Sequence, residues 1–197
     1  MIKGFHHNWE IIVLAILFVL FIAFCTGCQK QRRKAEAKSI LDEWIGKKIK
    51  FPESYECSLS GKDTSLFLCK RLMESEYKVL IYVDSTGCTE CKLQLMEWSN
   101  LINELNSIPK NHLSFLFFLY PKSIDELQLI LQRENFPYPI FIDNKDEINR
   151  LNNFVKQSKY QCFLLDNDNK VIVVGNPVQS TDILKLYKKE IGLSAVD

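Results

Sequence analysis

The strongest constraint on the fold is an alternation of apolar strands and an amphipathic helix in the middle of the chain. Residues 78–84 and 113–120 are short, nearly continuous apolar runs, which are typical of strands covered on both faces of a sheet. Between them, residues 88–106 place Cys91 and five larger apolar side chains on one helical face. Strand, helix and strand in this order predict a βαβ unit with two parallel strands.

The second half of the chain continues this alternation. Ser123 and Glu126 form a capping box at the start of a helix. The remaining elements are a short strand at 138–143, a short helix at 146–154, two strands around a polar turn at 161–177 and a closing helix at 180–191. The sequence therefore predicts an α/β domain whose central mixed sheet carries helices on both faces.

Composition places these elements in one domain and excludes one class of partner. A chain of 197 residues, 47% of them hydrophobic, buries one ordinary core. The net charge is +1, from 25 basic and 24 acidic residues, so no global field attracts nucleic acid and we expect no nucleic-acid partner.

Seven cysteines are many for an intracellular chain of this size and favour an oxidising compartment, here the cell envelope.

The N-terminal residues supply a candidate export signal. Residues 11–28 are almost wholly apolar and would extend about 27 Å as a helix at roughly 1.5 Å per residue, barely a membrane span. The run ends in CTGC, which resembles a bacterial lipoprotein lipobox whose last residue, Cys28, takes the lipid. We expect residues 1–28 to be a lipoprotein signal or membrane anchor, 29–50 a tether helix and 51–197 the globular domain.

Two features of the N-terminal region keep other forms of attachment open. Glu10 lies where a signal peptide carries basic residues, and the basic run 30–34 follows the apolar segment. An uncleaved helix could anchor an exported domain, or the positive-inside rule could keep the domain on the cytoplasmic side. All three arrangements attach the protein to a membrane, through a lipid or through the N-terminal helix.

The segment 57–69 (CSLSGKDTSLFLC) is interpreted as a hairpin that turns near Gly61. A register symmetric about Asp63 places Cys57 and Cys69 opposite each other, with Cβ atoms about 4.5 to 5.5 Å apart. That separation is near the reach of a disulfide, so we expect a structural bridge between them. The alternative is a pair of unrelated buried thiols.

The chemistry of the chain centres on Cys88 and Cys91 in a CxxC motif. The strand 78–84 leads through a short turn to Cys88, at or just before the first turn of a helix. Unpaired backbone N–H groups at that point stabilise a thiolate and lower its pKa. Cys91 lies one turn further, on the apolar face, where it can resolve a mixed disulfide. Glu90 either raises the pKa of Cys88 by repulsion or points into water as an ordinary first-turn acid.

This order of elements resembles the thioredoxin fold. The stretches KVLIYVDSTGCTEC, YPIFID and FLLDNDNKVIVVG resemble membrane-tethered thioredoxin-like proteins related to peroxiredoxins and cytochrome-maturation oxidoreductases. The resemblance covers roughly residues 78–191. It implies an exposed nucleophile at Cys88 with Cys91 as its partner, no cofactor, and thiol-disulfide exchange with envelope proteins and an unidentified redox partner.

Three departures from that family bear on catalysis. Ser85, Thr86 and Gly87 stand where an aromatic residue usually precedes the first cysteine, and Tyr82 replaces the buried acid six residues before it. No proline occurs near Tyr160, where the family has a cis-proline that borders the active site. The alternative function is therefore a non-catalytic thioredoxin-like interaction lipoprotein with a structural disulfide.

Other chemistries find less support in the sequence. A structural zinc site needs about four ligands, whereas this chain has one CxxC motif and a single histidine, His112, outside the N-terminal segment, so we expect no metal. Thr86 precedes Cys88 by two residues, which does not fit the spacing of a peroxidase motif. Cys162 should lie beside the active-site loop, either as a buried inert thiol or as a third redox cysteine.

Overall fold

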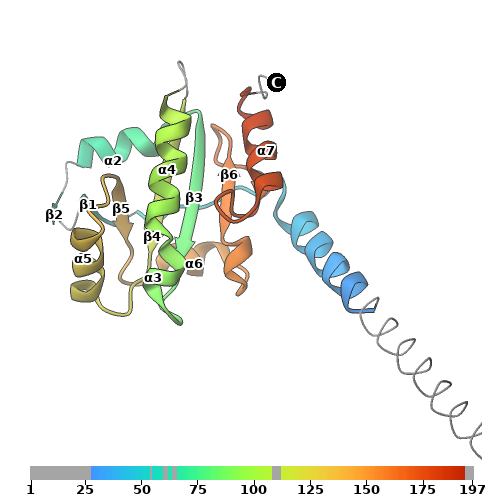
Figure 1. Ribbon diagram of the computed structural model, residues 1–197, viewed down its shortest axis with the longest axis horizontal. Helices are drawn as coiled ribbons and strands as arrows, with labels where there is room; N and C mark the ends of the chain where they lie inside the picture. Colours follow the sequence, from blue (N-terminus) through green and yellow to red (C-terminus); the bar gives the residue numbers. More distant parts are fainter. Residues whose placement is uncertain (1–27, 54, 60–61, 64–65, 108–111, 194–197) are drawn as a thin grey trace, which may run out of the picture. The chain divides into compact units, whose positions relative to one another are not determined.

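The computed structural model describes residues 28–53, 55–59, 62–63, 66–107 and 112–193 (Figure 1). Residues 1–27 of the expected signal or anchor segment, 1–28, lie outside the described residues. None of the helices in the described part of the chain is long and apolar enough to cross a membrane. The chain divides into two compact units, Met1–Glu43 and Trp44–Asp197. In the first unit residues 28–43 are helical, and Cys28 is exposed.

The described residues of the second unit form a seven-stranded sheet in the order β2-β1-β5-β4-β3-β6-β7. Its strands are β1 (Glu56–Leu59), β2 (Lys62–Asp63), β3 (Tyr77–Val83), β4 (Leu113–Leu119), β5 (Pro139–Ile142), β6 (Cys162–Leu165) and β7 (Val171–Val174). β3, β4 and β5 run parallel, whereas β1 and β6 pair antiparallel to β5 and β3. The mixed α/β sheet predicted from the sequence is confirmed.

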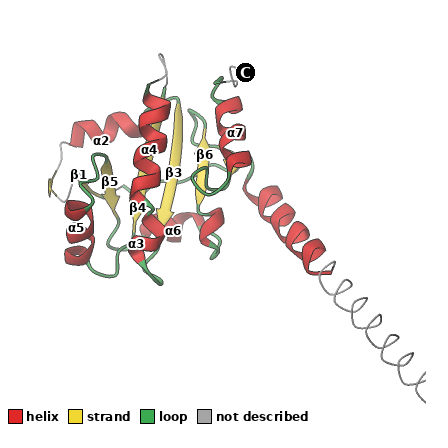
Figure 2. Cartoon of the chain, viewed as in Figure 1, coloured by secondary structure: helices red, strands yellow, loops and turns green. Residues whose placement is uncertain are grey.

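The helices of this unit are α2 (Leu66–Met73), α3 (Thr89–Leu93), α4 (Leu95–Asn106), α5 (Ile124–Arg133), α6 (Glu147–Asn152) and α7 (Thr181–Glu190), with a 3₁₀ turn at Ser158–Tyr160 (Figure 2). The later helices follow the predicted order, whereas α2 was not predicted and the single helix predicted for 88–106 is divided into α3 and α4. Ser123 Oγ accepts a hydrogen bond from the Glu126 amide at 3.3 Å, so the capping residue expected for α5 is in place.

The central strand β3 is buried on both faces, as its continuous apolar sequence predicts. Val79, Ile81 and Val83 belong to one core cluster with side chains of α4, α5 and α7. On the other face, Tyr82 packs against Phe154 with ring centroids 4.9 Å apart and ring planes tilted by 31°. Because successive side chains of a strand point to opposite faces, each face needs its own apolar cover.

The hairpin predicted for 57–69 is wrong in its second half. The pairing register joins Ser58 to Asp63, and Cys69 lies in α2 rather than on a facing strand. The residues from Leu66 onward have apolar side chains at helical spacing, which favours a helix once they pack against the sheet. Cys57 and Cys69 are nevertheless joined by a disulfide with a Cα–Cα distance of 6.6 Å, so the bridge connects β1 to a helix.

Candidate active site

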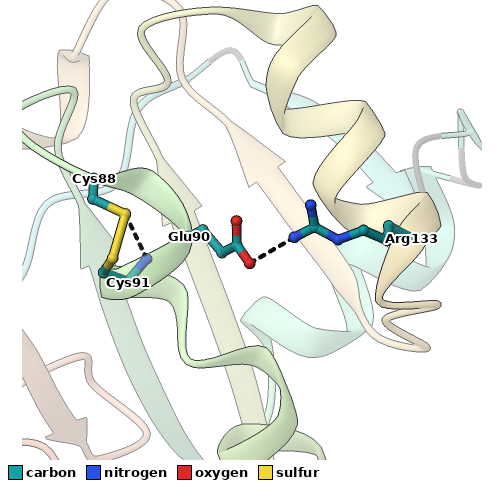
Figure 3. The surroundings of a disulfide bond; sticks show 4 residues. All are labelled: Cys88, Glu90, Cys91 and Arg133. Carbon is teal, nitrogen blue, oxygen red and sulfur yellow. Dashed lines mark hydrogen bonds and ion pairs between the residues drawn. A yellow bond between two sulfur atoms is a disulfide. The ribbon is translucent and has the colours of Figure 1, made fainter.

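The CxxC motif lies just beyond the carboxyl end of β3, where a short loop leads into α3 (Figure 3). Cys88 and Cys91 form a disulfide with a Cα–Cα distance of 5.4 Å. Cys88 has an extended backbone, φ −84° and ψ 111°, and is the N-cap residue of α3. Its Sγ accepts a hydrogen bond from the Cys91 amide at 3.2 Å. An amide that donates to sulfur favours the thiolate once the disulfide is reduced.

Both cysteines of the pair are exposed, so the prediction that Cys91 lies on a buried face is wrong. That prediction treated residues 88–106 as one continuous helix. Instead, the helix is interrupted at Gln94, which adopts a left-handed conformation with φ 47° and separates α3 from α4. The interruption shifts the helical phase, so the buried stripe begins at Leu93 and Leu95 and leaves Cys91 outside it.

A polar network supports the loop that precedes Cys88. Asp84 accepts hydrogen bonds from the Thr86 amide at 2.9 Å and from the Thr86 hydroxyl at 2.6 Å. The Lys92 ammonium forms an ion pair with Asp84 and donates to Thr86 Oγ1 at 3.0 Å. These contacts tie the turn before Cys88 to the residue that follows Cys91. Lys92 could not be recognised as a site residue from the sequence, because an isolated lysine carries no spacing signal.

The Asp84 carboxylate should stabilise this loop in a pH-dependent way. Burial raises its pKa, but hydrogen bonds from Lys92 and Thr86 outweigh burial and hold the pKa below its usual value. A group with a lowered folded-state pKa stabilises the fold above its unfolded pKa, and the effect is lost as the pH falls through the folded pKa. We expect Asp84→Asn to lower the free energy of unfolding by about 2 kcal/mol near neutral pH.

Urea unfolding at neutral and acidic pH tests this expectation. The difference between wild type and Asp84→Asn should begin to shrink as the pH falls below about 3.9, the usual pKa of an unfolded aspartate, and should be lost once the pH has passed the lowered folded-state pKa of Asp84. Asp42→Asn removes an exposed carboxylate from the first unit and serves as the control. A difference between wild type and Asp84→Asn that does not depend on pH would show that the network acts through packing and not through charge.

Two pockets lie on either side of the disulfide and share its two sulfur-bearing residues. The smaller encloses about 190 Å³, and its lining includes Lys92, Gln161, Cys162 and Gln179. The larger, which we call the glutamate groove, encloses about 530 Å³. Besides both cysteines, the glutamate groove is lined by Met96 and the glutamates Glu90, Glu97 and Glu134.

Cys162 is one of the residues that line the smaller pocket, but its thiol is unreactive at neutral pH. The side chain is buried, and burial raises the pKa of its thiol to about 12, against weaker lowering by hydrogen bonds with Tyr187 and with the Phe163 backbone. The Tyr187 hydroxyl lies 3.6 Å from the Cys162 sulfur and donates to the Gly175 carbonyl at 3.0 Å. The thiol therefore stays protonated at neutral pH, which favours the inert of the two predicted roles.

Tyr82 does not replace the missing buried acid as a proton carrier. Its hydroxyl donates to Asp146 Oδ1 at 2.6 Å, and burial raises its pKa far above the ordinary value for tyrosine. A phenol that holds its proton this strongly does not exchange it with Cys91 near neutral pH. The loop expected to contain a cis-proline has Gln161 instead, whose carbonyl accepts a hydrogen bond from the Tyr82 amide at 2.9 Å.

Glu90 points away from the disulfide and toward α5 (Figure 3). Its carboxylate forms an ion pair with Arg133 at 2.6 Å, and both side chains are 56% exposed. Arg133 also contacts Glu134 at 3.0 Å. Because the charge of Glu90 is compensated by a guanidinium from another helix, the carboxylate is not solvated alone and its repulsion of the Cys88 thiolate is reduced. The role of Glu90 in redox tuning stays a prediction.

The ion pair leads to a prediction about redox tuning. Both charges of the pair act on the Cys88 thiolate, and their effects oppose each other. Glu90→Gln removes the negative charge and should lower the pKa of Cys88, whereas Arg133→Gln removes the positive charge and should raise it. The double variant should return to about the wild-type value. Titration of thiolate absorbance in the three variants measures this, and an unchanged pKa in both single variants would show that the pair does not act on Cys88.

Among the described residues, no group of three or more His, Cys, Asp or Glu side chains is arranged to hold a metal ion. The site permits thiol-disulfide exchange for three reasons. Cys88 is exposed at a helix start, the Cys91 amide donates a hydrogen bond to its sulfur, and Cys91 lies at disulfide-bonding distance.

Comparison with known proteins identifies the fold. The thioredoxin domain of a thiol-disulfide oxidoreductase from Bacteroides vulgatus aligns with a TM-score of 0.53 and 14% identity, covering 75% of this chain and 97% of that domain. A mutant of PrxQ from Xylella fastidiosa aligns with a TM-score of 0.52 and 12% identity, covering 74% and 96%. A protein from Chlorobium tepidum assigned as the thiol:disulfide interchange protein DsbE aligns with a TM-score of 0.52 and 14% identity. The alignment covers 76% of this chain and 96% of that protein.

These alignments, together with the sheet order and the position of the CxxC motif, show that the chain has the thioredoxin fold. The thioredoxin-like fold class predicted from the sequence is confirmed. No protein-family model and no curated protein matches the sequence. At identities of this size the comparisons establish the fold alone, and the function has to be argued from the site.

Proposed function

We propose that the protein is a membrane-tethered thiol-disulfide oxidoreductase that exchanges disulfides with envelope proteins through Cys88 and Cys91. The observation that carries this proposal is the Cys88 sulfur, exposed at the start of α3 and hydrogen-bonded by the Cys91 amide. A sulfur in this setting is accessible to a large partner and leaves or attacks as a stabilised thiolate.

The exchange follows from the positions of the two sulfurs. In the reducing direction, the Cys88 thiolate attacks one sulfur of a client disulfide, and the other client sulfur leaves as a thiolate that takes up a proton. The Cys91 thiol then loses its proton and attacks the Cys88 sulfur, which releases the second client thiolate. Two electrons pass to the client and the Cys88–Cys91 disulfide forms. The oxidising direction is the reverse sequence.

The reduction potential of the pair tests the proposal. The full-length chain, purified in a mild non-ionic detergent, is equilibrated with glutathione redox buffers, and the Cys88–Cys91 state is read by alkylation and mass spectrometry. We expect a potential between about −120 and −270 mV, the range spanned by known exchange proteins. Cys162→Ala should not change it, because that thiol is buried.

A structural disulfide gives a different result. A potential below about −300 mV, together with no measurable exchange with glutathione, is typical of bridges that stabilise a fold. That outcome would favour the non-catalytic interaction lipoprotein, which the absence of a proline near Tyr160 and of an aromatic residue before Cys88 already suggests. Measured exchange within seconds to minutes would exclude it.

The membrane attachment is a separate part of the proposal and has its own prediction. We expect a mature chain that begins at a lipidated Cys28, because the CTGC sequence at the end of an apolar run resembles a lipobox. Intact mass spectrometry of protein from the membrane fraction measures the N-terminus. A mass that retains Met1 would favour an uncleaved helix, and normal processing of Cys28→Ser would show that cleavage does not depend on lipidation of Cys28.

A further inference from the structure

The surface on the glutamate-groove side of the disulfide carries an excess of negative charge. Three carboxylates line the glutamate groove, those of Glu90, Glu97 and Glu134, and no lysine or arginine is among the described residues that line it. Arg133 contacts two of these carboxylates, Glu90 at 2.6 Å and Glu134 at 3.0 Å. Three negative charges against one positive charge leave a net charge of −2 at the groove. A cation that enters it is therefore attracted.

The smaller pocket differs in charge but also indicates a ligand. Its cationic side chain, Lys92, is paired with Asp84 and contributes little net field. Gln161, only 3% exposed, is among the lining residues, and its Oε1 accepts no hydrogen bond within the described part of the chain. A buried acceptor without a donor carries a free-energy cost, and Oε1 would have to turn toward the pocket before a ligand N–H group could relieve it. Polypeptides offer such groups along their backbone.

The two pockets meet at the reactive sulfurs, since Cys88 and Cys91 line both. A client polypeptide joined to Cys88 must therefore pass across one or both of them. In an extended chain each residue advances about 3.3 Å, so the residues one or two positions from the client cysteine fall within the glutamate groove. Met96, 67% exposed, supplies a flexible apolar contact there.

From this arrangement we propose that the glutamate groove selects client polypeptides that carry lysine or arginine within two residues of the cysteine that reacts with Cys88. The inference rests on the proposed thiol-disulfide exchange and assigns its substrate class. The substrate preference depends on both the groove and the disulfide, because the carboxylates contact a client only while that client is bonded to Cys88. Glu97 and Glu134 are the specificity-determining residues, and neither belongs to the redox pair.

The test uses three synthetic peptides that differ only beside one central cysteine, which is flanked by lysine, serine or glutamate. Each peptide is supplied as a mixed disulfide with thionitrobenzoate, and reaction with the reduced full-length protein releases the coloured thiol. Reaction of each peptide with dithiothreitol, which is uncharged, corrects for the intrinsic reactivity of the peptide. At low salt we expect the corrected rate constant of the lysine peptide to exceed that of the glutamate peptide by about tenfold. High salt should reduce the ratio.

Variants of the groove connect the preference to its residues. The double variant Glu97→Gln and Glu134→Gln should reduce the lysine-to-glutamate ratio at least threefold, and the ratio cancels any change in Cys88 reactivity that the peptides share. Glu190→Gln, which removes an exposed carboxylate from α7 outside both pockets, should leave the ratio unchanged and serves as the matched control. Circular dichroism shows whether each variant is folded.

The outcomes separate this inference from the proposed function. If the protein reacts with all three peptides and the corrected rates are equal, the substrate preference is wrong and the oxidoreductase function stands. A preference that persists in the Glu97 and Glu134 double variant also overturns the assignment to the groove. If the reduced protein reacts with none of the peptides, both proposals fail.

Discussion

Replacement of Cys91 by alanine should convert the protein into a trap for its clients, whereas replacement of Cys88 should abolish exchange. Alanine keeps the backbone amide that donates to the Cys88 sulfur, so Cys88 remains activated while no resolving thiol is left. We expect Cys91→Ala to accumulate mixed disulfides at Cys88. Loss of the nucleophile in Cys88→Ala should lower the rate of exchange by roughly a thousandfold or more.

The order of alkylation gives a second measurement of the same assignment. Both cysteines are exposed, so solvent access does not distinguish them, and only the stabilised thiolate at Cys88 should make it react first near neutral pH. Mass spectrometry after brief alkylation of the reduced protein reads this order. Equal or reversed labelling, or the absence of any covalent partner for Cys91→Ala on non-reducing gels, would contradict the assigned roles.

The largest effect on stability should come from the Cys57–Cys69 bridge. Its two cysteines are separated by 12 residues and are almost fully buried, at 6% and 0% exposed. For a loop of this length, loss of the cross-link costs about 2 to 3 kcal/mol of unfolding free energy, mainly because the unfolded chain gains freedom. Urea unfolding of the double variant Cys57→Ala and Cys69→Ala measures it.

The matched control is the other disulfide. Cys88 and Cys91 are separated by only 3 residues and both are exposed, so Cys88→Ala with Cys91→Ala should change the stability much less. Peptide mapping without reduction should recover Cys57 joined to Cys69 in protein from the cell envelope. Free thiols at both positions, or equal stability of the two double variants, would contradict a structural role for the bridge.

Local patterns in the sequence were sufficient for most elements of the fold. The apolar runs of β3 and β4, the spacing of apolar side chains in α4 and the Ser123 cap of α5 were all recognised in advance. Each depends on residues a few positions apart in the sequence. Burial of one or both faces of a helix or strand requires apolar residues at a regular spacing, which the sequence shows directly. The placement of Cys88 at a helix start was predictable for the same reason, since a strand, a short turn and a helix follow one another directly.

The errors arose where distant segments decide the geometry. Cys69 was assigned to a strand because symmetry about a turn is a local assumption, whereas packing of α2 on the sheet depends on residues far along the chain. Cys91 was expected to be buried because a continuous helical phase was assumed. The left-handed Gln94, whose side chain accepts a hydrogen bond from Gln179 at 2.6 Å, interrupts that phase.

The sequence by itself determined the α/β class, the order of the elements and the position of the reactive pair at the end of β3, because these follow from local periodicity and from turn and cap residues. Only the tertiary structure decided the charge around the pair. The partner of Glu90 is Arg133 on α5, and Glu97 and Glu134 reach one groove from α4 and from the end of α5. Such contacts join residues that no spacing rule connects, since they depend on how the helices pack over the sheet.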